Sequence, residues 1–229
     1  MRLRAVTYNV QSFRAGVEAL RDVLEPLEAD VVLLQECRSR RAAEGLARLL
    51  GMDAVTSHRW LRRPRNGVLF RPPWRLASVQ VRDLPRTGRA LRRGFIVAHL
   101  RRLGARVAAV SVHLGLVGAE RALHARELTD FLASVEGPVV VGMDANEPPE
   151  GPAVRWLAQR YFDAFAVAGG AGGETFPASA PTARIDYLFV SDGVRVLSAR
   201  TVEEPSVLRA SDHRPVLADL ELEPSAGPP

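Results

Sequence analysis

Short apolar runs of strand length recur along almost the whole chain and alternate with segments in which apolar residues have helical spacing. Strands are expected at Leu3–Val10, Val31–Glu36, Val68–Arg71, Leu76–Val81, Phe95–Leu100, Val107–His113, Val139–Asp144, Ile185–Val190, Val194–Val202 and Val216–Leu222. Helices are expected at Gly16–Glu28, Ser39–Leu50, Ala119–Val135 and Ala153–Arg160. This alternation is typical of the α/β class, in which helices cover the faces of β-sheets.

Two connections between expected strands are too short to hold a helix. Leu76–Val81 follows Val68–Arg71 across Pro72-Pro73-Trp74, and Phe95–Leu100 leads through a short loop into Val107–His113. Such spacing predicts antiparallel hairpins, because parallel neighbours need a longer crossover. We therefore expect mixed sheets rather than purely parallel ones.

The length and composition fit one globular domain. With 229 residues and 47% hydrophobic side chains, the chain can bury a substantial core. We expect one domain over residues 1–222 and a disordered tail over 223–229. No apolar run approaches the roughly 20 residues of a membrane-spanning helix, and the first residues enter a strand pattern without a signal segment. The expected protein is a cytoplasmic monomer without a transmembrane segment.

The charge and the cysteine count exclude some sites and leave others open. All 31 basic residues are Arg, the formal net charge is +5, and the pI is about 10.4. A genome rich in G and C explains this, and Arg also suits phosphate binding. Basic loops at Arg59–Arg65 and Arg86–Arg93 are candidates for nucleic-acid contact or solvated charge runs. The single cysteine, Cys37, excludes intrachain disulfides and cysteine-based zinc sites.

Polar residues occur at the ends of several apolar strands, where their side chains would lie at one edge of a sheet. These residues are Asn9, Glu36, His113, Asp144, Asn146, Asp186, Asp212 and His213. Any one of them alone is more often a helix cap or a solvated strand end than a ligand. Together they would be costly to bury without a cation to balance them. A hard divalent metal held by oxygen ligands is the simplest partner.

In order and spacing, six motifs of the chain resemble the endonuclease/exonuclease/phosphatase superfamily. They are Thr7-Tyr8-Asn9-Val10, Leu34-Gln35-Glu36, Ser111-Val112-His113-Leu114, Gly142-Met143-Asp144-Ala145-Asn146, Arg184-Ile185-Asp186-Tyr187 and Ser211-Asp212-His213-Arg214-Pro215. The resemblance extends over nearly the whole chain. It implies a four-layer α/β/β/α sandwich with two packed mixed sheets and a site at one edge of them.

The resemblance also implies a site for Mg²⁺ or Mn²⁺. Glu36 matches the principal metal carboxylate of the family, with Asn9 and Asp212 in or near its shell. Some branches have a further acidic ligand two positions after the first Asn. Gln11 stands there in this chain, which leaves the second metal position open.

The remaining motif residues match the catalytic groups of the family. Asp144 would orient or deprotonate the attacking water, and Asn146 would donate to a phosphate oxygen. His213 would stabilise developing charge on the phosphate while Asp186 holds its ring. His113 is a candidate general acid or phosphate ligand.

Several residues resist assignment from the sequence. No acidic partner for His113 stands in a recognisable motif, although Glu44, Asp53 and Asp83 lie between it and Glu36. Asn66 is a site-edge residue or part of an ordinary Asn-Gly turn, and the turn is favoured. His58, His99 and His124 belong to no motif, so nothing ties them to the site.

These observations predict a metal-dependent hydrolase of phosphoester bonds: a phosphodiesterase, nuclease or phosphatase. Its partner would be a phosphorylated substrate, with nucleic acid among the candidates. The alternative is a catalytically silent module of the same fold that binds a phosphorylated ligand. Loss of Glu36, Asp144 or His213 would mark such a module, and all three are present.

Overall fold

The structure is a computed structural model that describes residues 1–57, 65–170 and 172–223. Apart from Glu223, the expected tail lies outside the described residues, and so does the basic loop Arg59–Arg65 apart from Arg65. No helix in the described part of the chain is long and apolar enough to span a membrane.

Two six-stranded sheets form the centre of the molecule. The first sheet holds, in spatial order, β11 (Val194–Thr201), β12 (Val216–Leu222), β1 (Arg2–Asn9), β2 (Val31–Gln35), β4 (Asn66–Phe70) and β3 (Asp53–Thr56). The second holds β5 (Arg75–Asp83), β6 (Gly94–Arg102), β7 (Ala105–His113), β8 (Val139–Asp144), β10 (Asp186–Val190) and β9 (Phe162–Asp163). The pairs β1–β2 and β7–β8 are parallel and the others antiparallel, so the expected mixed sheets are confirmed.

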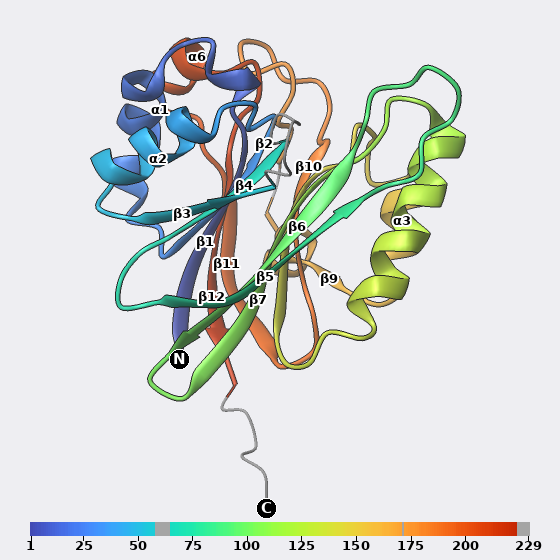
Figure 1. The fold of residues 1–229 in the computed structure, drawn as a ribbon. Helices are drawn as coiled ribbons and strands as arrows, with labels where there is room; N and C mark the ends of the chain where they lie inside the picture. Colours follow the sequence, from blue (N-terminus) through green and yellow to red (C-terminus); the bar gives the residue numbers. More distant parts are fainter. Residues whose placement is uncertain (58–64, 171, 224–229) are drawn as a thin grey trace, which may run out of the picture.

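Helices cover the outer faces of both sheets, as Figure 1 shows. The first sheet carries α1 (Val17–Leu24), α2 (Arg40–Leu49) and α6 (Val207–Ala210), and the second carries α3 (Gly118–Leu132) and α4 (Pro152–Leu157). Short elements complete the chain: the 3₁₀ helices Gln11–Phe13 and Glu25–Leu27, and α5 (Ala164–Ala168). The result is the expected four-layer α/β/β/α sandwich.

One of the two expected hairpins is wrong. β6 and β7 pair as predicted, but β4 belongs to the first sheet and β5 to the second. Every residue of β4 is buried, and β2 and β3 already occupy its two edges. The chain therefore crosses between the sheets after β4, and Trp74 is buried in the core between them.

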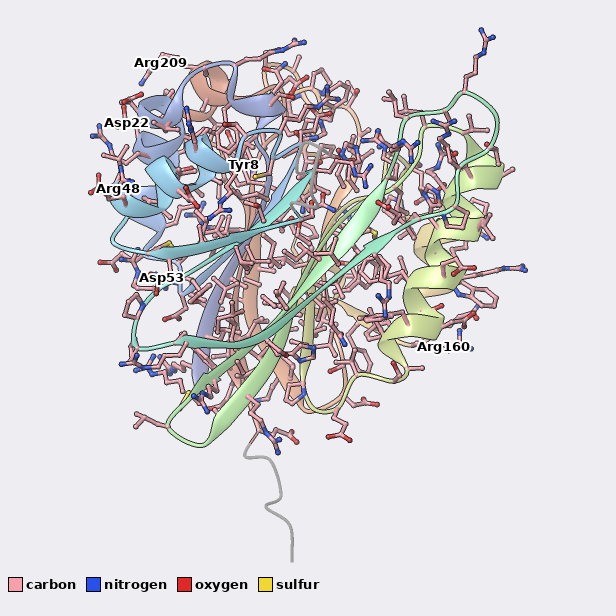
Figure 2. All side chains as sticks on the ribbon, viewed as in Figure 1. Tyr8, Asp22, Arg48, Asp53, Arg160 and Arg209 are labelled. Atoms are coloured by element: carbon pink, nitrogen blue, oxygen red, sulfur yellow. The ribbon has the colours of Figure 1, made fainter. Side chains whose placement is uncertain are left out.

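Alternate side chains along the strands of the first sheet belong to different cores, one between the two sheets and one under the helices. In β1, Leu3 and Ala5 face the second sheet, whereas Val6 and Tyr8 pack under the helices of the first. In Figure 2, Tyr8 lies inside this helix-covered layer, while labelled charged residues such as Asp22 and Arg48 lie at the surface.

A buried polar network fastens the sheets together near one end. The Gln35 Nε2 atom donates to Ser111 Oγ at 3.2 Å and to the Gly142 carbonyl at 3.1 Å. Ser111 Oγ donates in turn to the Leu34 carbonyl at 2.7 Å. Gly142 permits this approach, because a Cβ there would lie 2.6 Å from Leu33 Cβ. The polar strand ends found in the sequence lie directly beyond this network.

Candidate active site

The alternation of strand side chains explains why the polar motif residues meet. In β1, β7 and β8 the residue four positions before the last one, such as Ala5 or Val140, belongs to the core between the sheets, and so does Leu188, two positions after the start of β10. The last residue of that parity in β1, β7 and β8, and the first in β10, therefore points into the gap between the sheets. Those residues are Asn9, His113, Asp144 and Asp186. They converge where β1 ends, at the upper end of the sandwich in Figure 1.

Asp144 lies at the centre of this convergence. Its side chain is buried, and its Oδ2 atom accepts a hydrogen bond of 2.8 Å from Asn9 Nδ2. The same oxygen lies 3.1 Å from His113 Nε2. Its Oδ1 atom accepts the Asn146 backbone N–H at 3.0 Å. Both oxygens thus have N–H partners, which lowers the cost of burying the carboxylate.

His213 approaches Asp144 from another side and is held by Asp186. The His213 Nδ1 atom lies 2.8 Å from Asp186 Oδ2, and its Nε2 atom lies 3.9 Å from Asp144 Oδ2. Burial lowers the pKa of His213, but the charge and hydrogen bond of Asp186, with Asp144 and Asp212, outweigh burial and raise it to about 10. His213 is consequently a cation at neutral pH.

Besides the Asp144 carboxylate at Nε2, His113 has a basic partner at its other ring nitrogen, Nδ1. Arg93, directly before β6, places Nη1 at 2.9 Å from His113 Nδ1, and both side chains are buried. Burial, together with the charge of Arg93, lowers the pKa of His113 to about 3 despite the opposing charge of Asp144. Sequence reasoning missed Arg93 because it is one of several arginines in a basic run.

Asn146 joins the network through its side chain. Its Nδ2 atom lies 2.9 Å from His113 Nε2 and donates to the Leu114 carbonyl at 3.2 Å. Its backbone is left-handed, with φ of 52°. Asn tolerates this conformation better than most residues, and such strain often occurs at functional sites.

Glu36 and Asp212 lie at the half-buried rim of the site. Glu36 Oε2 accepts a hydrogen bond of 3.2 Å from Ser12 Oγ, and both residues have left-handed backbones. Asp212 Oδ1 lies 3.4 Å from Ser211 Oγ, which donates to the Asn9 carbonyl at 2.6 Å. The structure thus joins Asp212 to the central network through Ser211, and Glu36 to the turn that follows β1.

Asn66 does not form the expected turn. It is the first residue of β4, is fully buried, and donates from Nδ2 to the Gly94 carbonyl at 2.5 Å. It therefore connects the two sheets next to Arg93. Arg184, by contrast, is bound to Asp163 at 2.6 Å and stacks on Tyr187, which gives it a structural place away from the central network.

The donor set fits a divalent metal ion. The carboxylates at the site are those of Glu36, Asp144, Asp186 and Asp212. The buried cations are Arg93 and His213, with the exposed Arg38 nearby, so negative charge is in excess. Oxygen-rich sites of this kind suit Mg²⁺ and Mn²⁺.

One cluster within the site is compact enough to hold an ion. One atom from each of Asp144, Asp186 and His213 lies within 4.8 Å of the others. A protonated imidazole has no lone pair for a metal, so His213 suits the role of N–H donor better. Among the described residues, Asp186 Oδ1 is a buried acceptor without a hydrogen-bond partner, which again fits a nearby cation.

Residues 6–213 match the family described as the endonuclease/exonuclease/phosphatase family. The chain belongs to this family. Among curated proteins, none matches the chain. As a member of the endonuclease/exonuclease/phosphatase family, it shares its fold with solved structures from several organisms.

Three of these structures illustrate the range. An endonuclease/exonuclease/phosphatase from Bacteroides vulgatus has a TM-score of 0.85 at 21% identity, with 97% of this chain and 100% of that chain covered. A mannosyl-6-phosphatase from Bacteroides thetaiotaomicron gives 0.81 at 17% identity, with 96% and 100% covered. D. rerio TDP2 complexed with a single-strand DNA product gives 0.80 at 17% identity, with 96% and 99% covered.

Proposed function

We propose that the protein is a metal-dependent hydrolase of phosphoester bonds. The observation that carries the proposal is the buried Asp144 carboxylate, surrounded by Asn9, His113 and a cationic His213. Such a group can accept a proton from water while the N–H donors beside it bind an anion. The family match over residues 6–213 supports the same chemistry.

In the proposed reaction, water attacks phosphorus in line with the leaving oxygen. Asp144 orients this water and accepts its proton. His213 and Asn146 donate hydrogen bonds to phosphate oxygens, on which negative charge increases, and Asp186 keeps the His213 ring in place. Preorganised donors of this type stabilise the transition state because they need no rearrangement as charge develops.

We assign the metal to Glu36, with Asn9 and Asp212 in or near its shell. A bound Mg²⁺ or Mn²⁺ would neutralise charge on the non-bridging phosphate oxygens. Ser12 holds the Glu36 carboxylate from the side of the turn after β1, and Ser211 links Asp212 to the backbone of Asn9. These contacts would orient the oxygen ligands of the proposed metal site.

Two relatives suggest which substrates to test first. One is described as a mannosyl-6-phosphatase and the other as bound to a single-strand DNA product. Purified protein should therefore be assayed against sugar phosphates, single-stranded DNA and supercoiled plasmid, with Mg²⁺, with Mn²⁺ and with EDTA.

We expect one substrate class to be hydrolysed only in the presence of metal, and His213→Ala to lose that activity. Asp219→Asn, a change in a surface ion pair with Arg4, serves as the matched control. Binding of a phosphorylated ligand without turnover of any substrate would instead favour the silent binding module.

A further inference from the structure

The contact between Arg93 and His113 decides where the His113 ring carries its proton. A guanidinium group has only N–H donors and stays charged at any physiological pH. Arg93 Nη1 lies 2.9 Å from His113 Nδ1, so Nδ1 must present its lone pair. The proton of the neutral ring is then on Nε2, which lies 3.1 Å from Asp144 Oδ2.

Asn146 forms a contact that favours the opposite arrangement. Its Nδ2 atom lies 2.9 Å from His113 Nε2, and an amide nitrogen is a donor. The Asn146 amide can turn over and present its oxygen at the cost of its 3.2 Å hydrogen bond to the Leu114 carbonyl, whereas a guanidinium has no acceptor in any orientation. Arg93 therefore determines, more strongly than Asn146, which nitrogen of the His113 ring carries the proton.

The two active-site histidines thus have groups of opposite charge at their Nδ1 atoms. His213 directs Nδ1 at a carboxylate, Asp186, and so carries a proton there. His113 directs Nδ1 at a cation and carries its proton on the other nitrogen. Each ring has its Nε2 atom toward Asp144, at 3.1 Å for His113 and 3.9 Å for His213.

Arg93 is buried, and hydrogen bonds to the backbone around it fix its position. Its side chain is only 7% exposed, and among the described residues its Nε atom has no hydrogen-bond partner. Its backbone carbonyl accepts a hydrogen bond of 3.0 Å from Leu84 N, which closes the loop over residues 84–93. Asn66 holds the carbonyl of the next residue, Gly94. Burial lowers the pKa of Arg93 although the charges of Asp144 and Glu36 raise it, so this position is costly for a cation.

Helix α3 fixes the same loop from outside. The buried Glu120 carboxylate accepts the Thr87 backbone N–H at 3.0 Å. His124 Nε2 lies 2.7 Å from the Pro85 carbonyl, while its Nδ1 accepts the Gly115 N–H at 3.2 Å. His124, which no motif connected with the site, therefore anchors the loop that ends at Arg93.

We propose that Arg93 is a positioning residue that holds His113 as the neutral tautomer protonated on Nε2. His113 then serves as a hydrogen-bond donor to a phosphate oxygen or to Asp144, and it does not act as a cationic acid. The statement about the phosphate rests on the proposed function, whereas the statement about the tautomer rests on the geometry alone.

Nitrogen NMR of the histidine rings tests the tautomer in the intact protein. Long-range ¹H–¹⁵N correlation spectra at pH 7 would identify His113 among the five histidines by its absence in His113→Gln. We expect a protonated Nε2 and an unprotonated Nδ1 in the wild-type protein. A proton on Nδ1 of His113 would overturn the proposal.

Variants of Arg93 then test whether this residue determines the His113 tautomer. In Arg93→Gln, the amide can accept as well as donate, so the tautomer protonated on Nδ1 should become populated. Arg93→Lys keeps a cationic donor and should retain the wild-type tautomer, as should Arg92→Gln, a change in the exposed neighbour. Unchanged His113 signals in the spectrum of Arg93→Gln would show that Arg93 does not determine the tautomer of this ring.

Kinetics separate positioning from direct substrate binding. We expect Arg93→Gln to lower kcat roughly 10–100-fold, as loss of a supporting contact commonly does, with little change in KM and partial recovery in Arg93→Lys. A raised KM with an unchanged tautomer would assign Arg93 to substrate binding and overturn the proposal. If no substrate is hydrolysed by the wild-type protein, the proposed function fails, and the spectra still decide the role of Arg93.

Discussion

At the scale of single residues, the residue that contacts Nδ1 of each active-site histidine determines which charge state of the ring is favoured. Asp186 behind His213 favours the charged imidazole, and Arg93 behind His113 favours the neutral one. Between them, Asp144 accepts hydrogen bonds at both oxygens. One carboxylate therefore faces one cation and one neutral donor, an asymmetry that suits a group that takes a proton from water.

Replacement of Asp144 by Asn should remove activity and leave the fold intact. The amide has the same shape and its oxygen can still accept from Asn9 Nδ2, so packing persists and only the hydrogen bond from the Asn146 N–H is lost. We expect kcat to fall about 10²–10⁴-fold, the usual contribution of a general base, with Tm within a few degrees of wild type. Near-wild-type turnover by this variant on the true substrate would remove Asp144 from the proposed role.

The pair of His213 and Asp186 predicts a pH-dependent contribution to stability. The folded-state pKa of His213 is raised to about 10, above the value of about 6.5 for an unfolded chain. The stabilisation is therefore complete below about pH 6.5 and declines as pH rises toward 10. In EDTA, the difference in Tm between wild type and Asp186→Asn should shrink from pH 7 to pH 9. A constant or widening difference would contradict the assigned charge.

The sequence revealed the motif residues of the site but not their supports. Asn9, Asp144 and His213 stand at recognisable strand ends, so their convergence could be predicted from alternation and order. Arg93 could not, because it lies in a run of arginines and nothing local distinguishes a buried one. The metal-binding roles of Glu36, Asn9 and Asp212 remain predictions.

At the scale of elements, long and strongly patterned segments were predictable and short ones were not. All ten expected strands occur, within two residues of their predicted ends. The strands β3 and β9, with four and two residues, and the helices α5 and α6 are too short to show a period. The missed β3 also explains the wrong hairpin, because it takes the edge of β4 that β5 was expected to fill.

Because the sheets approach closely at Gly142, the addition of one methyl group there should lower both stability and activity. A Cβ at Gly142 would lie 2.6 Å from Leu33 Cβ and 2.7 Å from Thr7 Oγ1, atoms fixed in neighbouring strands. Gly142→Ala should destabilise the protein by about 1–3 kcal/mol through overpacking. It should also lower activity, because the displaced β8 carries Asp144.

Gly45 provides the matched control in chemical denaturation. It lies inside α2, and a Cβ there would meet no atom within 4 Å. Gly45→Ala should stabilise the protein by about 0.5–1 kcal/mol, since alanine loses less backbone freedom than glycine in a helix. Equal effects of the two substitutions on the unfolding free energy would show that the sheets do not meet at Gly142 as described.

At the scale of the whole molecule, a basic protein holds an acidic site. The net charge is +5, yet carboxylates from four separate segments gather where the two sheets meet. Only the folded chain brings them together, so a cation that binds there must stabilise the fold. Folding and metal binding are therefore expected to be coupled.

This coupling predicts a rise in Tm on addition of Mg²⁺ or Mn²⁺ to protein freed of metal with EDTA. At a free ion concentration of 100 times Kd the stabilisation is about 2.7 kcal/mol, or roughly 5–10 °C for a domain of this size. Glu36→Gln should move the midpoint of the titration to at least about tenfold higher metal, the typical cost of a weakened metal site. Glu221→Gln, a change in an exposed pair with Arg195, should leave the midpoint unchanged. If Tm in the wild type does not respond to either ion, or if both variants titrate alike, Glu36 is not the metal carboxylate.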